Sequence, residues 1–346
     1  MEGAGFEWHS SSRLCHLDLP DTKYKFMAQG ANFLHRLLHI AGLFLGCLLI
    51  CTLGAEAILR FALGLGNPVL IAADPACRYI LKPDQNVYRF FGHVSINHFG
   101  MRSEAVPKQR TPGTLRVLFV GDSMTYGTTQ VDQREIFSER VHTALPGIIH
   151  RPVEVLNASA GAWAPANELA YLRSRGTFQA DVVVLVLNDG DISQPMSSMR
   201  DVGDALPHVK PSSAIGELYE RYLKVHIFHV KPKIDAGDSV KLDASSVVQE
   251  NLQVFDQIQQ LVARSGARLV VLFVPFRLDF PEIVRQPETT ITAWTATHHV
   301  PLIDLSATEA LYPAKEITLD GIHLNAKGNS IVAQAVEASW AHLVGQ

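Results

Sequence analysis

An apolar run that ends in Gly-Asp-Ser is the feature of this sequence that most limits its fold. The run extends from Val117 to Val120, and Gly121-Asp122-Ser123 follows directly. Continuous apolar runs of this kind form strands that are covered on both faces of a parallel sheet. In open α/β sheets, ligands bind at the edge where such strands end. The sequence therefore predicts the Ser123 hydroxyl at this edge, where it needs a base to become a good nucleophile.

The far end of the sequence offers such a base. Asp320 and His323 are three residues apart in Asp320-Gly321-Ile322-His323, a spacing that puts both on one side of a turn. A carboxylate in that position can hold and orient the imidazole. We predict that Ser123 is the nucleophile, that His323 is the general base and that Asp320 orients it.

The two motifs together resemble the SGNH hydrolases, also called the GDSL family of esterases and lipases. The signature of that family is Gly-Asp-Ser near the start and Asp-x-x-His near the end, and the resemblance covers Leu115 to the C-terminus. It implies ester chemistry through an acyl-enzyme and a flavodoxin-like strand order. The α/β-hydrolase elbow Gly-x-Ser-x-Gly is disfavoured, because Thr125 stands where that motif needs its second glycine.

Short apolar runs recur through the rest of the chain with helical stretches between them. Five strands joined by helical crossovers predict an α/β fold, a three-layer α/β/α sandwich with a five-stranded parallel sheet. A chain of 346 residues with 47% hydrophobic residues can bury one such core and a small accessory region. The predicted strands are Leu115–Val120, Val153–Asn157, Asp181–Leu187, Arg268–Val274 and Pro301–Leu305.

The candidate oxyanion donors follow the predicted strands. The run from Asn157 to Trp163 looks like the second block of the family, with Ala162 at the usual glycine position and Gly161 one residue early. Alanine keeps its N–H, so a backbone donor is still present. Asn188 stands in a run similar to the Gly-x-Asn-Asp block of the family, although Val186 replaces the glycine. The resemblance implies an oxyanion hole formed by the Ser123 N–H, the N–H of Gly161 or Ala162, and the Asn188 side chain.

Metal ions, cofactors and nucleic acids are not indicated. Asp189 and Asp191 are close in sequence, but no third ligand is nearby, so a structural hydrogen-bonding role is favoured over a metal site. A net charge of -4 gives no general basic field that would attract nucleic acid. We therefore expect no metal, no cofactor and no nucleic-acid partner.

A long uncharged stretch precedes all these motifs. Leu37–Ala55 contains 19 residues without a charge, close to the ~20 that a helix needs to cross the hydrocarbon layer. We predict a cytoplasmic tail over residues 1–36 and a transmembrane signal-anchor helix over 37–60. The alternatives are a buried helix or a cleaved signal sequence, for which Ala55-Glu56-Ala57 offers a small-x-small pattern.

The basic residues around this stretch indicate its orientation. Lys23, Lys25 and Arg36 precede it, and only Arg60 and Arg78 follow closely. The positive-inside bias then places the N-terminus in the cytoplasm. We expect a single-pass protein of the cell inner membrane whose catalytic domain is extracytoplasmic, in the periplasm.

The segment after the span reads as an accessory region. Residues 61–113 are predicted to be a small extracytoplasmic linker, with a hairpin formed by Val87–Phe90 and His93–Ile96. Arg102 near its end could reach an anionic group of a substrate, but a solvated arginine that closes a turn is the favoured prediction. The hydrolase domain is expected over 114–346.

The third predicted strand is followed by a connection that is long for a compact domain. We predict a substrate-shaping insertion or lid over 190–243. A helix is expected within it, over Ser212–Lys224.

These features favour a serine esterase that removes O-acetyl or other short acyl groups. Its substrate would be an acylated small molecule or, more specifically, an exopolysaccharide or cell-envelope glycan, and envelope or polysaccharide-secretion machinery is a candidate partner. An O-acyltransferase that moves the acyl group to a glycan hydroxyl has the same motifs. The substitutions at Ala162 and Val186 motivate a third reading, an inactive membrane-anchored glycan-binding or scaffold protein.

Overall fold

The structure is a computed structural model that describes residues 22–198, 206–224, 227, 244–277 and 286–344. The chain divides into two units, Met1–Ala55 and Glu56–Gln346. Parts of the predicted insertion, residues 199–205, 225–226 and 228–243, lie outside the described residues, as does most of the predicted cytoplasmic tail.

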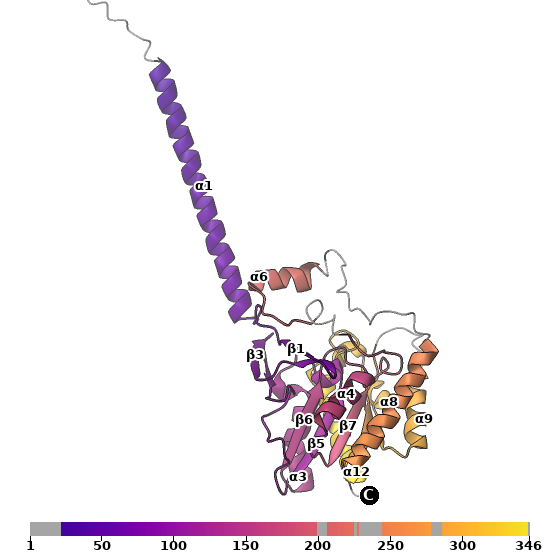
Figure 1. Cartoon of the computed structure of the whole chain (residues 1–346). Helices are drawn as coiled ribbons and strands as arrows, with labels where there is room; N and C mark the ends of the chain where they lie inside the picture. Colours follow the sequence, from indigo (N-terminus) through magenta and orange to yellow (C-terminus); the bar gives the residue numbers. More distant parts are fainter. Residues whose placement is uncertain (1–21, 199–205, 225–226, 228–243, 278–285, 345–346) are drawn as a thin grey trace, which may run out of the picture. The chain divides into compact units, whose positions relative to one another are not determined.

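The centre of the second unit is a five-stranded sheet in which every neighbouring pair is parallel (Figure 1). The strand order β6-β5-β7-β8-β9 is the flavodoxin-like order that the family resemblance implied. All five predicted strands are confirmed, with ends that differ by at most two residues. Their bounds are β5 Leu115–Gly121, β6 Val153–Ser159, β7 Val182–Leu187, β8 Arg268–Phe273 and β9 Leu302–Asp304.

Side chains that alternate along the strands form a hydrophobic core on each face of the sheet. On β5, Leu118 and Val120 belong to one core, and Val117 and Phe119 belong to the other. Because successive residues of a strand point to opposite faces, both faces need a cover of helices. The predicted three-layer α/β/α sandwich is confirmed.

Two groups of helices provide these covers (Figure 1). Helices α4, α8 and α9 contribute Leu169, Phe255 and Trp294 to the first core, whereas α3 and α12 contribute Phe137 and Trp340 to the second. The bounds are α3 Phe137–Ile149, α4 Pro165–Arg175, α8 Ala244–Arg264, α9 Gln286–Thr297 and α12 Ala326–Val344.

Two antiparallel hairpins precede the sheet in sequence. The predicted hairpin is confirmed as β3 (Gln85–Arg89) and β4 (Gly92–Ile96). A second hairpin, β1 (Ile71–Asp74) and β2 (Arg78–Leu81), was not predicted. Buried residues of both hairpins belong to the first core together with the sheet.

Arg102 is a correction to the sequence analysis, because it is fully buried instead of solvated. Its guanidinium donates to the carbonyl oxygens of Tyr126, Thr128 and Val131, the first at 2.8 Å and the last at 2.7 Å, and to the Gln133 side chain at 3.2 Å. These carbonyls follow Ser123 in sequence and point inward. An arginine in a solvated turn could not donate hydrogen bonds to them. The spacing of residues in the sequence did not indicate that Arg102 would be buried.

The insertion contains the predicted helix. Helix α6 (Ala214–Glu217) continues without a break into the π-helical turn η2 (Leu218–Leu223). Ser213 caps its start, because its side chain accepts a hydrogen bond from the Gly216 N–H.

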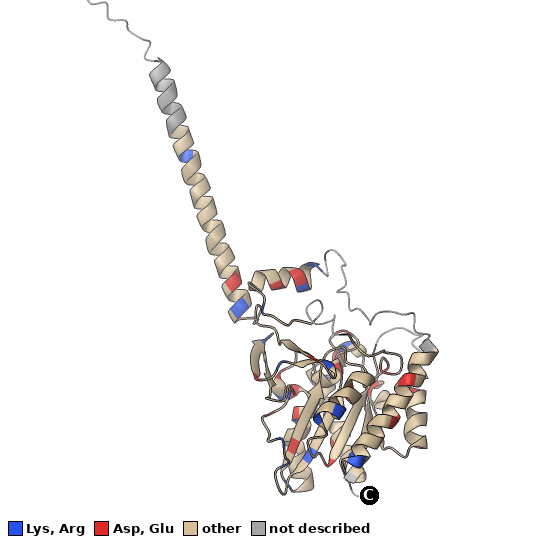
Figure 2. Cartoon of the chain, in the orientation of Figure 1, with Lys and Arg blue, Asp and Glu red and all other residues tan. Residues whose placement is uncertain are grey.

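Helix α1 covers Thr22–Phe61, and its part Asn32–Phe61, which contains an 18-residue stretch with a mean hydropathy of 2.2, is long and apolar enough to cross a membrane. Figure 2 shows few charged side chains on the coloured part of this helix above its lower end. Near that end Glu56 and Arg60 form an ion pair at 2.6 Å.

Candidate active site

The nucleophile candidate lies where β5 ends and the short helix α2 (Ser123–Tyr126) begins. Asp122 caps this helix, because its carboxylate accepts the Met124 N–H at 2.8 Å. A side chain at Gly121 would approach the Thr125 hydroxyl to 2.1 Å, so this position has room only for glycine. The Gly-Asp-Ser sequence thus makes a tight strand-to-helix turn.

A line of hydrogen bonds joins the three predicted catalytic residues. His323 Nε2 lies 3.0 Å from the Ser123 hydroxyl oxygen. The other ring nitrogen of His323, Nδ1, lies 2.7 Å from Asp320 Oδ2. Because a carboxylate can only accept, Nδ1 carries the proton and Nε2 presents its lone pair to the serine. The tertiary structure has therefore brought together residues 200 positions apart in the orientation that proton transfer needs.

Local backbone contacts hold the Asp320 carboxylate in its ionised form. Its Oδ1 accepts the N–H groups of Ile322 and His323 at 3.0 and 2.8 Å. Partial burial raises the pKa of Asp320, but the bond to the His323 ring and these N–H groups outweigh it, and the net pKa lies below its ordinary value. The group that orients the imidazole is thus charged at neutral pH.

The loop after β6 contains both candidate backbone donors. Ala162 has a φ of +59°, in the left-handed region where glycine is favoured. The alanine therefore adopts a backbone angle that glycine reaches without strain. Two residues that were not predicted as site residues stabilise this loop by hydrogen bonds. The Tyr79 hydroxyl donates to the Gly161 carbonyl at 2.8 Å, and the Gln194 side chain donates to the Ala162 carbonyl at 3.0 Å.

Asn188 is nearly buried and fixed on three sides. Its Nδ2 donates to Asp122 Oδ2 at 3.0 Å, its Oδ1 accepts the Gly190 N–H at 2.8 Å, and its backbone N–H donates to Asp191 Oδ2 at 2.7 Å. An amide nitrogen has two hydrogens, so the bond to Asp122 leaves one for a ligand. Asp122 thereby links the turn that holds Ser123 to the side chain of Asn188.

Three buried carboxyl groups lie together behind this contact. They belong to Asp122, Glu168 and Asp191, and both carboxyl oxygens of Glu168 are without a hydrogen-bond partner among the described residues. Burial, together with the charges of Asp191 and Asp122, raises the pKa of Glu168 well above its ordinary value. Burial also raises the pKa of Asp191 well above its usual range. The sequence analysis missed Glu168, which has no recognisable motif around it.

Asp189 and Asp191 have the structural hydrogen-bonding roles that were favoured over a metal site. Asp191 accepts the Asn188 N–H, and Asp189 accepts the Phe276 N–H at 2.5 Å. A different group could hold a metal, since Glu104, Glu139 and His142 have ligand atoms within 4.8 Å of one another. The interaction of the His142 ring with the Glu139 carboxylate, which accepts from it, raises the pKa of His142, so a metal ion would have to compete with a proton for that ring.

Glu309 is a buried acid near Asp189 with a consequence for stability. It ends α10 (Ser306–Glu309), and neither of its carboxyl oxygens has a hydrogen-bond partner among the described residues. Burial raises its pKa from 4.5 to about 8, against the opposing charge of Arg277. Between these two values the folded chain keeps a proton that the unfolded chain has lost, so stability falls as the pH rises through this window.

We therefore expect Glu309→Gln to stabilise the chain at alkaline pH and to change little in acid. A shift of this size corresponds to at most about 5 kcal/mol. Thermal unfolding of the wild type and the variant at about pH 5 and about pH 9 measures it. Parallel melting curves at both pH values would show that Glu309 does not titrate in this window.

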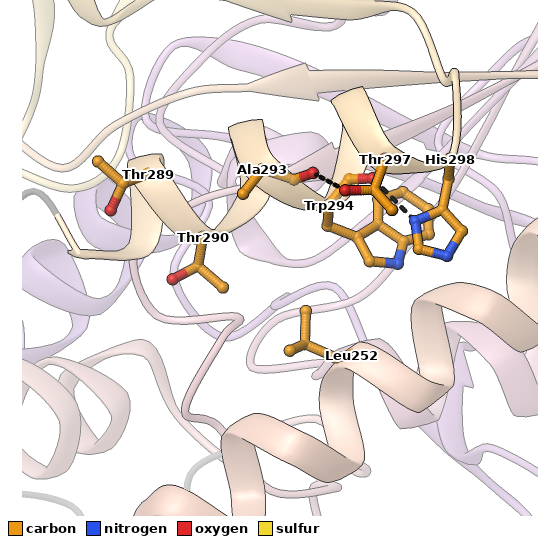
Figure 3. Close-up of a pocket in the computed structure, with 7 residues that line it drawn as sticks. All are labelled: Leu252, Thr289, Thr290, Ala293, Trp294, Thr297 and His298. Carbon is orange, nitrogen blue, oxygen red and sulfur yellow. Dashed lines mark hydrogen bonds between the residues drawn. The ribbon is translucent and has the colours of Figure 1, made fainter.

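Two of the pockets in the described part of the second unit differ in their distance from the candidate site. A pocket of about 220 Å³ lies between Tyr126 and Gly161 of the candidate site and the segments that contain Val69, Pro207 and Arg221. Another pocket, of about 410 Å³, lies between α8 and α9 (Figure 3) and is lined by none of the predicted site residues. Its walls are Leu252, Thr289, Thr290, Ala293, Trp294, Thr297 and His298.

Several residues that line the pocket in Figure 3 contact one another or α8. The rings of Trp294 and His298 are stacked with centroids 4.7 Å apart, and Asp256 accepts the Trp294 indole N–H at 2.8 Å. These groups pack α9 against α8.

No family model and no curated protein matches the sequence. Three solved structures that are similar to the chain show 14–16% identity, each over 66% of this chain. TesA is covered to 99% with a TM-score of 0.44. A lipolytic G-D-S-L family member from Veillonella parvula and the acetyl xylan esterase AlAXEase are each covered to 100% with a TM-score of 0.43. All three similarities are low, both in sequence and in structure.

Proposed function

We propose that the protein is a serine ester hydrolase that works through an acyl-enzyme. The observation that carries the proposal is the hydrogen-bonded line from Ser123 through His323 to Asp320. A nucleophile, a base and a group that orients the base are the three parts that covalent acyl transfer needs. The proposal assigns these parts to Ser123, His323 and Asp320 in that order.

In the first half of the reaction His323 Nε2 takes the proton of Ser123, and the serine oxygen attacks the ester carbonyl carbon. The negative charge that develops on the carbonyl oxygen is stabilised by the N–H groups of Ser123 and of Gly161 or Ala162, and by the free N–H of Asn188. When the tetrahedral intermediate collapses, the C–O bond to the alcohol breaks. The alcohol leaves with the proton from His323, and the acyl group remains on Ser123.

In the second half a water molecule replaces the alcohol. His323 takes a proton from the water, whose oxygen attacks the acyl carbon. The bond to Ser123 then breaks, and the serine oxygen regains its proton from His323. Asp320 keeps its charge throughout and stabilises the imidazolium that forms in both halves.

The direct test is to observe the covalent intermediate. Full-length protein in detergent is mixed with a series of 4-nitrophenyl esters, quenched during the first turnovers and analysed by mass spectrometry. A mass increase equal to the acyl group, located on the peptide that contains Ser123, supports the proposal. Ester hydrolysis without acylation of that peptide would rule out the covalent mechanism.

We further propose that the natural substrate is an O-acetyl or other short acyl ester on a cell-envelope glycan outside the cytoplasm. The proposal rests on the helix that can cross a membrane and on the basic residues before it, which favour an extracytoplasmic domain. Hydrolysis rates on acetylated glycans, compared with long-chain esters of the same alcohol, test the acyl preference. Adding a glycan acceptor and analysing the products distinguishes hydrolysis from transfer.

Asn188→Ala is expected to slow the reaction without unfolding the chain. Loss of one donor to the oxyanion costs roughly 2.7–4 kcal/mol in the transition state, or about 10²- to 10³-fold in kcat. KM should change little, because the donor acts mainly on the charged intermediate. Steady-state kinetics of both proteins measure this, and a loss below about tenfold in a folded variant would remove Asn188 from the oxyanion hole.

A further inference from the structure

Exposed large apolar side chains are unevenly distributed over the second unit. Eight such side chains lie on three segments, which are the end of α1, the hairpin β3–β4 and the region 209–227. Elsewhere among the described residues of this unit, only Ile148, Leu311 and Leu319 are comparable. Single exposed apolar residues are ordinary, but a concentration of them marks an interaction surface. The eight are Ile58, Phe61, Tyr88, Phe91, Val209, Tyr219, Leu223 and Ile227.

Direct contacts join these three segments into one surface. The Glu56 carboxylate accepts the N–H groups of Ala214 and Ile215 at 2.8 and 3.0 Å, so α6 begins on the last turns of α1. The Phe90 N–H of the hairpin donates to the Leu63 carbonyl at 3.0 Å, and the Phe90 ring lies 5.9 Å from that of Tyr222. We call this the membrane-side surface.

A buried ion pair stabilises the same junction. Arg89 of β3 and Glu217 of α6 are 3% and 2% exposed and form a short ion pair. Glu217 also accepts the Gly66 N–H at 2.5 Å. Breaking a buried pair leaves an uncompensated charge and is costly. The helix that carries Tyr219 and Leu223 is therefore rigidly attached to the chain that leaves α1.

The sequence places this junction at the boundary of the hydrocarbon layer. Glu56 directly follows the uncharged stretch Leu37–Ala55, and 19 helical residues extend about 28 Å, close to the thickness of the hydrocarbon core. A helix that begins on the Glu56 carboxylate begins at that boundary as well.

The helix has the side-chain pattern of an interfacial helix. Tyr219 and Leu223 are four residues apart and are exposed, whereas Ala214 and Glu217 are buried. An interval of four places side chains on one side of a helix. Tyrosine is favoured at the membrane interface, and an apolar stripe beside basic residues inserts shallowly there. The nearby basic groups are Lys210 and Arg221, whereas Lys224 forms an ion pair with Glu220 at 2.8 Å.

We propose that the membrane-side surface lies in the headgroup layer of the bilayer that α1 spans, so that the second unit is docked on lipid. The pocket of about 220 Å³ is then open to substrates at the lipid surface, because Arg221 and Tyr222 of the docked helix line it together with Tyr126 and Gly161. Arg221 makes no ion pair or hydrogen bond with the described residues. This consequence rests on the proposed function. It implies that the substrate of the site is an ester carried at the bilayer surface.

Docking can be measured without any activity. Tyr219 and Ile148 are similarly exposed, at 46% and 44%, but only Tyr219 lies on the membrane-side surface. The full-length variants Tyr219→Trp and Ile148→Trp are placed in phosphatidylcholine–phosphatidylglycerol vesicles that contain brominated lipids, and the wild-type fluorescence is subtracted. Stronger quenching and a blue shift for Tyr219→Trp support docking. Equal, weak quenching of the two added tryptophans would overturn it.

A second experiment tests the consequence for the substrate. The Leu223→Asp/Ile227→Asp variant is compared with Ile148→Asp, using an amphiphilic ester in the vesicles and 4-nitrophenyl acetate in solution. We expect the first variant to lose rate on the vesicle-borne ester alone, and the control to keep both rates. Unchanged rates, or equal losses on both esters, would overturn the assignment. If the wild type hydrolyses neither ester, the proposed function fails, and the fluorescence result still decides docking.

Discussion

Ser123→Ala is expected to lower kcat/KM for ester hydrolysis by at least about 10⁴-fold, because no other hydroxyl in the described site can form the acyl-enzyme. Its partner is His323 at 3.0 Å, so His323→Ala should cost a similar factor. The two residues act as one unit, and the double variant should be no slower than either single variant. Steady-state hydrolysis of 4-nitrophenyl acetate by full-length protein measures all three.

The matched control for this prediction is Ser330→Ala on α12. Ser330 is also partly exposed near a helix start, and its removal should leave the rate unchanged. Near-additive losses in the double variant would show that Ser123 and His323 work separately. A folded Ser123→Ala variant with wild-type turnover would end the serine-esterase proposal.

Asp320→Asn is expected to have the second largest effect, a loss of up to about 10⁴-fold in kcat. The amide keeps the size of the side chain, but it removes the negative charge 2.7 Å from His323 Nδ1. It also allows the amide NH₂ to face that nitrogen, which would favour the wrong tautomer for accepting the Ser123 proton. KM should stay within a few-fold, because Asp320 touches the imidazole instead of the substrate.

A suitable control for the second variant is Asp304→Asn. Asp304 is an exposed acid at the end of β9 whose Oδ1 accepts the Ser306 N–H at 2.8 Å, and asparagine can keep that capping bond. Loss of kcat in Asp320→Asn but not in Asp304→Asn assigns the effect to the imidazole. Comparable kcat values in both variants and the wild type would mean that Asp320 has no role in orienting His323.

The strands and the nucleophile motif were accessible to prediction because they are local patterns. A parallel strand that is covered on both faces must be apolar along its length, and the runs ending near Ser123 and Asn188 have that property. The strand order came from the family resemblance instead, since apolar runs do not say which strands are neighbours.

Other parts of the site depend on contacts that leave no local signal. Tyr79 supports the Gly161 carbonyl from 82 positions away, and Arg102 is buried because three inward-pointing carbonyls need donors. Neither residue has a spacing that distinguishes it from an ordinary tyrosine or arginine. The hairpin β1–β2, which carries Tyr79, contributes residues to the same core as the sheet.

The sequence by itself determined which residues can perform the chemistry, because Gly-Asp-Ser and Asp-x-x-His specify reactive groups and their immediate backbone. Only the tertiary structure decided that Ser123 and His323 meet at 3.0 Å, that Asn188 is fixed by Asp122, and that α6 begins on Glu56. Such contacts form when the sheet and its helices bury their apolar faces together. That burial depends on the summed packing of the whole chain, and it brings distant polar groups together without any signal in their own neighbourhoods.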